Sequence, residues 1–173
     1  MRAVVSLTMA IFVVAASSAM ADWVSMEDDK AFGGQVQQAL GFGDEAALGV
    51  RCEDGDLQVS VATAEDWEKE MVAMNLLQPA IVLSFDRAEP VSYPATLMES
   101  GLHKVIAIMQ DDDDGSVRKV AQQIADAKKR VDVAVEFGGK RFYPSKVAVK
   151  GAKRHVERVL KACTTDDGKT QDA

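Results

Sequence analysis

Residues 48–61 read LGVRCEDGDLQVSV, in which apolar and polar side chains alternate on both sides of Asp54 and Gly55. Alternation with a period of two is typical of a strand that buries one face, and an Asp-Gly pair favours a tight turn between paired strands. The stretch therefore predicts a β-hairpin. Cys52 occupies an apolar position of the alternation, so we expect its side chain on the buried face of that hairpin.

Other parts of the chain show the same alternation or a helical one. The further candidate strands are residues 23–24, 81–86, 102–109, 131–137 and 143–149. Apolar residues at helical spacing predict three helices, which follow Thr63, Ser116 and Gly151. The third apolar stripe ends at Cys163, which should therefore face the interior.

The first 21 residues have the composition of an export signal. Arg2 is followed by an apolar run from Ala3 to Ala16 and then by small residues that end at Ala21. A membrane anchor needs about 20 apolar residues to cross the hydrocarbon core, and this run is shorter. We therefore expect a signal peptide at residues 1–21, and a periplasmic or secreted mature protein without a transmembrane anchor.

Cys52 and Cys163 are the cysteines of the mature chain, and an exported protein with an even number of cysteines usually pairs them. The sequence contains no C-x-x-C pair, and its two histidines lack the local spacing that is typical of a zinc site. This spacing favours a structural disulfide over a redox or metal-binding role. We therefore predict a bond between Cys52 and Cys163.

A bond between these residues would place the last helix, apolar side down, on the sheet that contains the first hairpin. Together the elements predict an α+β fold, a mainly antiparallel β-sheet or sandwich with two to three helices packed on it. This would be a single domain over residues 22–163, followed by a mobile polar tail at residues 164–173. The unit from residue 102 to 137 could pair its two strands through a helical crossover.

Charge is unevenly distributed along the chain. Residues 22–116 contain 5 basic and 20 acidic residues, whereas residues 117–161 contain 13 basic and 4 acidic ones. An acidic total disfavours general nucleic-acid binding, although a local basic face can still meet an anionic surface. The alternative is that the two halves neutralise each other in the folded protein.

Two motifs in the sequence could indicate a cofactor or cation site. Gly41 to Ala46 matches G-x-G-x-x-A, but the motif precedes a strand rather than a helix, so we interpret it as a loop and expect no cofactor. The acidic run before Gly115 does not fit the EF-hand register. It stays a weak candidate for a nonstandard cation site, with Asp111, Asp112, Asp113 and Asp114 as its ligands.

Basic residues gather on the predicted last helix and just before it. Their ammonium and guanidinium groups could bind phosphate or carboxylate, which the cell envelope supplies in quantity. The alternative is a solvated helix face. The candidate anion-binding residues are Lys146, Lys150, Lys153, Arg154, Arg158 and Lys161.

The mature chain resembles small exported bacterial proteins of the invasion-associated locus B family and the VasI-type accessory proteins of type VI secretion. The resemblance is carried by Trp23-Val24, Leu48-x-Val50-x-Cys52-x-x-Gly55-x-Leu57, Ser84-Phe85-Asp86-Arg87, Val131-x-Val133-x-Val135, and Val147-x-Val149-x-Gly151-Ala152 leading to Cys163. It implies a β-rich periplasmic domain without a known active site.

We therefore expect a periplasmic accessory or binding protein that acts through contacts with an envelope protein or an anionic envelope component, without catalysis. One alternative is an inhibitor of an envelope hydrolase such as lysozyme. Another is an envelope hydrolase that uses carboxylates the sequence does not identify. The sequence leaves the oligomeric state open.

Overall fold

A computed structural model describes residues 23–29, 35–66, 69–100, 103–109 and 115–165. The expected signal peptide and residues 166–173 lie outside this part of the chain. The described residues form ten strands, two α-helices and one 3₁₀ helix. All the strand pairings among them are antiparallel, as the alternation pattern predicted.

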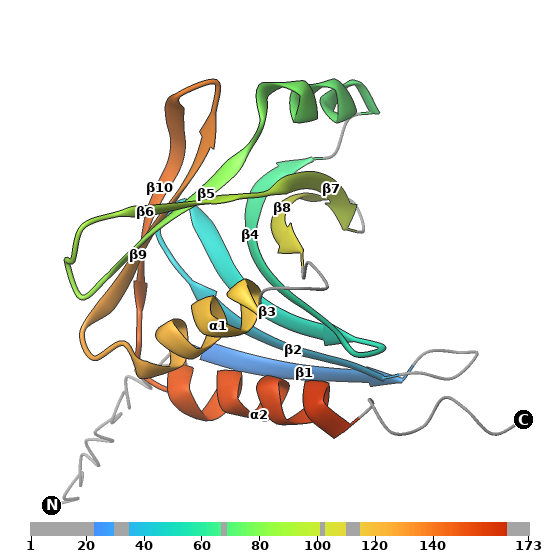
Figure 1. Cartoon of the computed structure of the whole chain (residues 1–173), viewed down its shortest axis with the longest axis vertical. Coiled ribbons are helices and arrows are strands. Elements are labelled where there is room, and N and C mark those ends of the chain that lie inside the picture. Colours follow the sequence, from blue (N-terminus) through green and yellow to red (C-terminus); the bar gives the residue numbers. More distant parts are fainter. Residues whose placement is uncertain (1–22, 30–34, 67–68, 101–102, 110–114, 166–173) are drawn as a thin grey trace, which may run out of the picture.

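A six-stranded sheet forms one part of the fold (Figure 1). Its spatial order is β1 (Trp23–Asp29), β2 (Gln35–Phe42), β3 (Ala46–Glu53), β4 (Asp56–Asp66), β8 (His103–Met109) and β7 (Thr96–Ser100). Strands β3 and β4 are the hairpin predicted from residues 48–61, and they turn at Asp54 and Gly55.

A four-stranded sheet forms the second part of the fold. Its spatial order is β10 (Lys140–Ala148), β9 (Arg130–Phe137), β5 (Ala80–Phe85) and β6 (Val91–Pro94). Only Ala95 separates β6 from β7, so one stretch of chain serves as an edge strand of both sheets. The N–H of Ala95 donates to the carbonyl oxygen of Pro79 at 2.9 Å and fixes this crossing.

The helices α1 (Ser116–Asp126) and α2 (Ala152–Thr165) pack against each other and against the six-stranded sheet (Figure 1). Their apolar stripes are buried as predicted. The buried residues are Val117, Val120, Ala121, Ile124, Val156, Val159 and Leu160. Neither α-helix of the described residues is long and apolar enough to span a membrane.

A disulfide joins Cys52 on β3 to Cys163 on α2, with 5.6 Å between their Cα atoms. Both cysteines belong to one hydrophobic core, to which both sheets and both helices contribute side chains. Each large apolar side chain fully buried there contributes about 1.5–3 kcal/mol through removal from water. The predicted α+β arrangement and its disulfide are therefore present.

The carboxylate of Asp86 holds the turn that enters β9. It accepts backbone N–H groups of Lys128, Lys129 and Arg130 at 2.9, 2.6 and 3.2 Å. The bonds from Lys128 and Lys129 keep the pKa of Asp86 below its ordinary value. Lys128 and Lys129 follow the end of α1 and contribute their backbone amides to this turn.

The helix expected behind Thr63 begins later than predicted. Strand β4 continues through Thr63 to Asp66, where it pairs with His103 of β8 after an irregularity in register. A 3₁₀ helix, η1 (Lys69–Leu77), then follows. Strand pairing prevails here over the expected helix start, and Thr63 is buried within the sheet.

The expected crossover between residues 102 and 137 is wrong. Strand β8 belongs to the six-stranded sheet and β9 to the four-stranded one, so α1 connects two sheets. The interpretation of residues 41–46 as a loop is also partly wrong, because Gly41 and Phe42 end β2. A Cβ on Gly41 would lie 2.4 Å from Cε2 of Trp23, so the glycine allows the indole to lie against this strand.

Candidate functional site

The register of the six-stranded sheet separates two sets of side chains. Residues directly opposite each other on paired strands project to the same face, and neighbours along a strand project to opposite faces. The inner face lies toward the helices and the core, and its residues are buried. It comprises Trp23, Ala39, Leu48, Val50, Cys52, Leu57, Val59, Val61, Ile106 and Ile108.

The opposite side, which we call the outer face, is also mainly apolar; Gly49, Ser60 and Ala107 at its centre are buried, and its margins are more exposed. Its apolar and small residues are Val24, Met26, Val36, Leu40, Phe42, Ala47, Gly49, Ser60, Ala62, Val105 and Ala107, and the same register places the polar residues Gln38, Arg51 and Gln58 on it. Phe42 is 50% exposed and Met26 is 48% exposed. Both described α-helices lie on the inner side of this sheet, and neither of them covers the outer face.

The centre of the outer face is shallow because its residues are small. Gly49 lies beside Ser60, and a Cβ on that glycine would come within 2.8 Å of the Ser60 hydroxyl oxygen. Two hollows flank this centre. The one beside Phe42, Ala47 and Ala62 has a volume of about 340 Å³, and the one between Met26, Val36 and Arg51 has about 170 Å³.

Exposed carboxylates border the outer face at the ends of its strands. They are Asp28, Asp44, Glu45, Asp54 and Asp56. Arg51 lies on the face itself, where its guanidinium forms an ion pair with Glu53 at 2.6 Å. Carboxylates therefore surround the apolar surface. They belong to the acidic half of the sequence.

The six predicted anion-binding residues do not form one cluster. Lys146 lies on β10 and lines a separate hollow with Arg141 and Asp132. Lys153 forms an ion pair with Glu157 at 3.7 Å. The others are exposed along α2 or in the turn before it, and they are Lys150, Arg154, Arg158 and Lys161.

Two of these cations meet at the junction of β1 and α2. Arg158 donates to the Ser25 hydroxyl oxygen at 3.1 Å, and Nδ1 of His155 lies 2.9 Å from the same oxygen. A guanidinium nitrogen of Arg154 lies 3.1 Å from Nε2 of His155. Burial, with the charges of Arg154 and Arg158, lowers the pKa of His155.

The contact with Arg154 determines which ring nitrogen of His155 carries the proton. A guanidinium only donates, so Nε2 of His155 accepts from Arg154 and Nδ1 carries the proton that is donated to Ser25. Ser25 therefore receives two donors and faces no proton acceptor on His155. The Ser25 and His155 pair is not arranged as a nucleophile with its base.

A second polar cluster ties the two sheets together. The ammonium of Lys104, on β8 and only 3% exposed, forms an ion pair with Glu65 of β4 and donates to the Tyr143 hydroxyl at 2.8 Å. Burial acts to lower the pKa of Lys104, but the bonds to Glu65 and Tyr143 outweigh it and raise that pKa. The bond from Lys104 lowers the pKa of Glu65. The cluster is a polar link within the fold.

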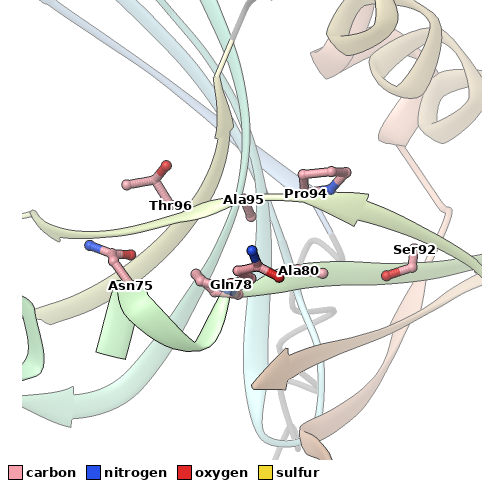
Figure 2. A pocket seen from close by; sticks show the side chains of 8 residues that line it. Asn75, Gln78, Ala80, Ser92, Pro94, Ala95 and Thr96 are labelled. Atoms are coloured by element: carbon pink, nitrogen blue, oxygen red, sulfur yellow. The ribbon is translucent and has the colours of Figure 1, made fainter. Parts of the chain in front are cut away.

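A pocket of about 690 Å³ lies where the chain crosses between the sheets (Figure 2). Gln78 and Ala80 lie on one side, and Ser92 and Thr96 belong to the crossing segment. Asn75 pairs with the backbone of Leu97, accepting its N–H at 2.7 Å and donating to its carbonyl at 3.1 Å. The lining residues, all within the described part, offer hydrogen-bonding groups but no ionisable side chain.

One further sequence prediction concerns residues that the structure does not describe. The candidate cation ligands Asp111, Asp112, Asp113 and Asp114 lie outside the described residues. Among the described residues, no group of three or more His, Cys, Asp or Glu side chains is placed to hold a metal ion. The acidic loop therefore stays a prediction.

Comparisons with known proteins add no relative to this description. No family model matches the chain, and no curated protein or solved structure matches it. The resemblance to the invasion-associated locus B and VasI-type proteins therefore stays a prediction. The function has to be argued from the surfaces described above.

Proposed function

We propose that this protein is an extracytoplasmic accessory protein, without catalysis, that binds a partner protein on the outer face. The observation that carries this proposal is the mainly apolar outer face of the six-stranded sheet, on which Phe42 and Met26 are 50% and 48% exposed. Monomeric soluble proteins rarely leave a contiguous apolar patch of more than a few hundred Å² uncovered, and larger patches usually mark binding sites.

The shape of the outer face suits a protein ligand better than a small molecule. Its centre is built of small residues, and its most exposed large side chains are Phe42 and Met26. A partner could pack against the small residues while Phe42 enters a pocket of that partner. Buried aromatic anchors of this kind contribute most of the binding energy in many interfaces.

The charge around the face defines the chemistry of the partner. Because Asp28, Asp44, Glu45 and their neighbours frame the apolar surface, the partner should carry an apolar centre with a basic margin. Charges at an interface rim mainly accelerate association and are screened by salt. Added salt should therefore slow association while the apolar centre keeps the complex together.

The extracytoplasmic location is supported by the disulfide and by the leader-like first 21 residues. A cross-link between Cys52 and Cys163 would be kept reduced in most cytosols, whereas it persists in a periplasm or outside the cell. A secreted location and a periplasmic one are equally compatible with this bond.

The proposal is tested with residues 22–173 immobilised and exposed to an envelope extract, with the wild type compared against Phe42→Asp. We expect one stoichiometric partner that is lost from Phe42→Asp. The matched control is Leu76→Asp, which places the same charge on an exposed leucine of η1. The partner should then bind the wild type as a purified protein, and this complex should again require Phe42.

Three results would contradict the proposal. Equal capture by wild type and Phe42→Asp, or no partner at any salt concentration, would remove the proposal. A concentration-dependent dimer in light scattering that is abolished by Phe42→Asp would show that a second copy occupies the face, and would also overturn it.

The alternative functions are separated by direct assays. The proposed accessory role predicts that lysozyme clears a cell suspension at the same rate with and without excess protein. It also predicts no release of fragments from purified cell wall. Inhibition of lysis, or digestion that disappears on an Asp or Glu substitution, would assign the protein to one of the other classes.

A further inference from the structure

We infer that the junction of β1 and α2 binds a tetrahedral phosphate-type oxyanion between Arg154, Arg158 and the hydroxyl of Ser25. This inference is independent of the partner proposed for the outer face. Ser25 alternates with the outer-face residues Val24 and Met26, so it projects to the other side of the sheet. The two surfaces can therefore be tested separately.

The first argument is the charge at the junction. Arg154 and Arg158 lie one helical turn apart, and like charges at this spacing repel each other. Among the described residues, no carboxylate forms an ion pair with either guanidinium, and Glu157 between them pairs with Lys153. An anion placed between the arginines would remove this repulsion.

The second argument is the number of hydrogen-bond donors that remain at the junction. The Ser25 hydroxyl oxygen already accepts from His155 and Arg158, so its own O–H proton remains to be donated. Each arginine has five N–H donors, of which the Ser25 and His155 contacts use one apiece. The Ser25 hydroxyl and the two guanidinium groups, which lie around His155, thus keep donors for an added ligand.

The third argument is the match between these donors and the ligand. Guanidinium groups bind phosphate through two parallel hydrogen bonds, and a tetrahedral oxyanion can meet three separate donors at once. The shared ligand chemistry is therefore a phosphate group, either free or in a phospholipid headgroup.

The test uses residues 22–173 with the disulfide intact. Inorganic phosphate is titrated at constant ionic strength while NMR follows the side-chain N–H signals of Arg154 and Arg158 and the imidazole of His155. We expect saturable shifts at these three residues. Arg158→Gln should weaken binding by about tenfold or more, as expected for the loss of a charge-assisted pair.

Two further variants make the result specific. Lys153→Gln removes the same charge from the same helix, but its ammonium pairs with Glu157, so phosphate affinity should change less than about twofold. Arg158→Lys keeps the charge but loses the planar fork, and should weaken binding severalfold. It also serves as the test if Arg158→Gln does not fold.

A vesicle arm identifies the source of the phosphate group. Sedimentation with phosphatidylglycerol vesicles that depends on Arg158, and is absent with phosphatidylcholine, assigns the site to an anionic headgroup. Binding of inorganic phosphate without vesicle binding assigns it to a free phosphate. The inference is overturned if neither probe requires Arg154 or Arg158, or if Lys153→Gln weakens binding as much as Arg158→Gln.

Discussion

The indole Nε1 of Trp23 donates a hydrogen bond to the carbonyl oxygen of Ala148 at 2.6 Å. Trp23 begins the edge strand of the six-stranded sheet, and Ala148 ends the edge strand of the four-stranded one. The bond therefore closes the fold where the first and last strands meet. The indole is 1% exposed and lies against Gly41, so this contact tolerates no added side chain.

Gly41→Ala should lower the free energy of unfolding by about 1–3 kcal/mol, because its Cβ would overlap the Trp23 ring and force a shift in the sheet. Urea unfolding followed by circular dichroism measures the loss. In a Trp23→Phe background, where the ring is smaller, the same substitution should cost less. Equal losses in the two backgrounds would show that the indole is not the obstacle.

Cys52→Ser and Cys163→Ser should each lower stability by a few kcal/mol and by similar amounts, because either change removes the same cross-link over 111 residues. The chain-entropy model gives about 4–5 kcal/mol for a loop of this length. Urea unfolding of both single variants and of the double variant checks this. A double variant much less stable than either single one would contradict a shared origin of the loss.

Asp86→Asn should destabilise the protein at neutral pH, because the amide replaces a charged acceptor of three backbone N–H groups. The folded pKa of Asp86 is lowered, so its stabilising contribution is present above the unfolded pKa and is lost as the pH falls through the folded one. The difference between wild type and variant should therefore be constant above about pH 5 and shrink as the pH falls from about 5 toward 2. Urea midpoints across this range, with Asp44→Asn as an exposed control, measure the effect; a constant difference would refute the electrostatic origin.

Glu65→Leu should cost more stability than Lys104→Met. Removing Glu65 leaves the nearly buried ammonium of Lys104 with Tyr143 as its remaining partner in the cluster, whereas Glu65 is 50% exposed and can be hydrated when Lys104 is removed. We expect a loss of about 2 kcal/mol for the first variant and less than about 1 kcal/mol for the second. Denaturant unfolding of both variants measures the two losses. The reverse order would show that desolvation of the Lys104 ammonium does not dominate the stability of the pair.

The sequence predicted those elements whose hydrophobic period is clean. The hairpin around Asp54 and the apolar stripe of α1 both bury one face, so their periodicity survives in the structure. The disulfide was predicted from the even number of cysteines together with the expected export of the protein. Strand β2 escaped detection because Gln37 and Gly41 occupy two of its inward positions, where an apolar residue would have marked the alternation.

The candidate sites were harder to foresee because they depend on which strands become neighbours. Ser25 and His155 are 130 residues apart, and only the packing of α2 beside β1 brings them together. The outer face likewise requires the order of six strands, which alternation alone does not specify. Residues such as Ala47, Ala62 and Ala107 give no sequence signal for either face, and cross-strand register decides where they point.

The side-chain amide of Asn75 caps part of a sheet edge. It occupies the backbone N–H and C=O of Leu97 on the free edge of β7, where the strand of another molecule would otherwise add. The asparagine therefore takes the place of a neighbouring strand at this point of the edge and leaves Leu97 without free backbone groups for an added one.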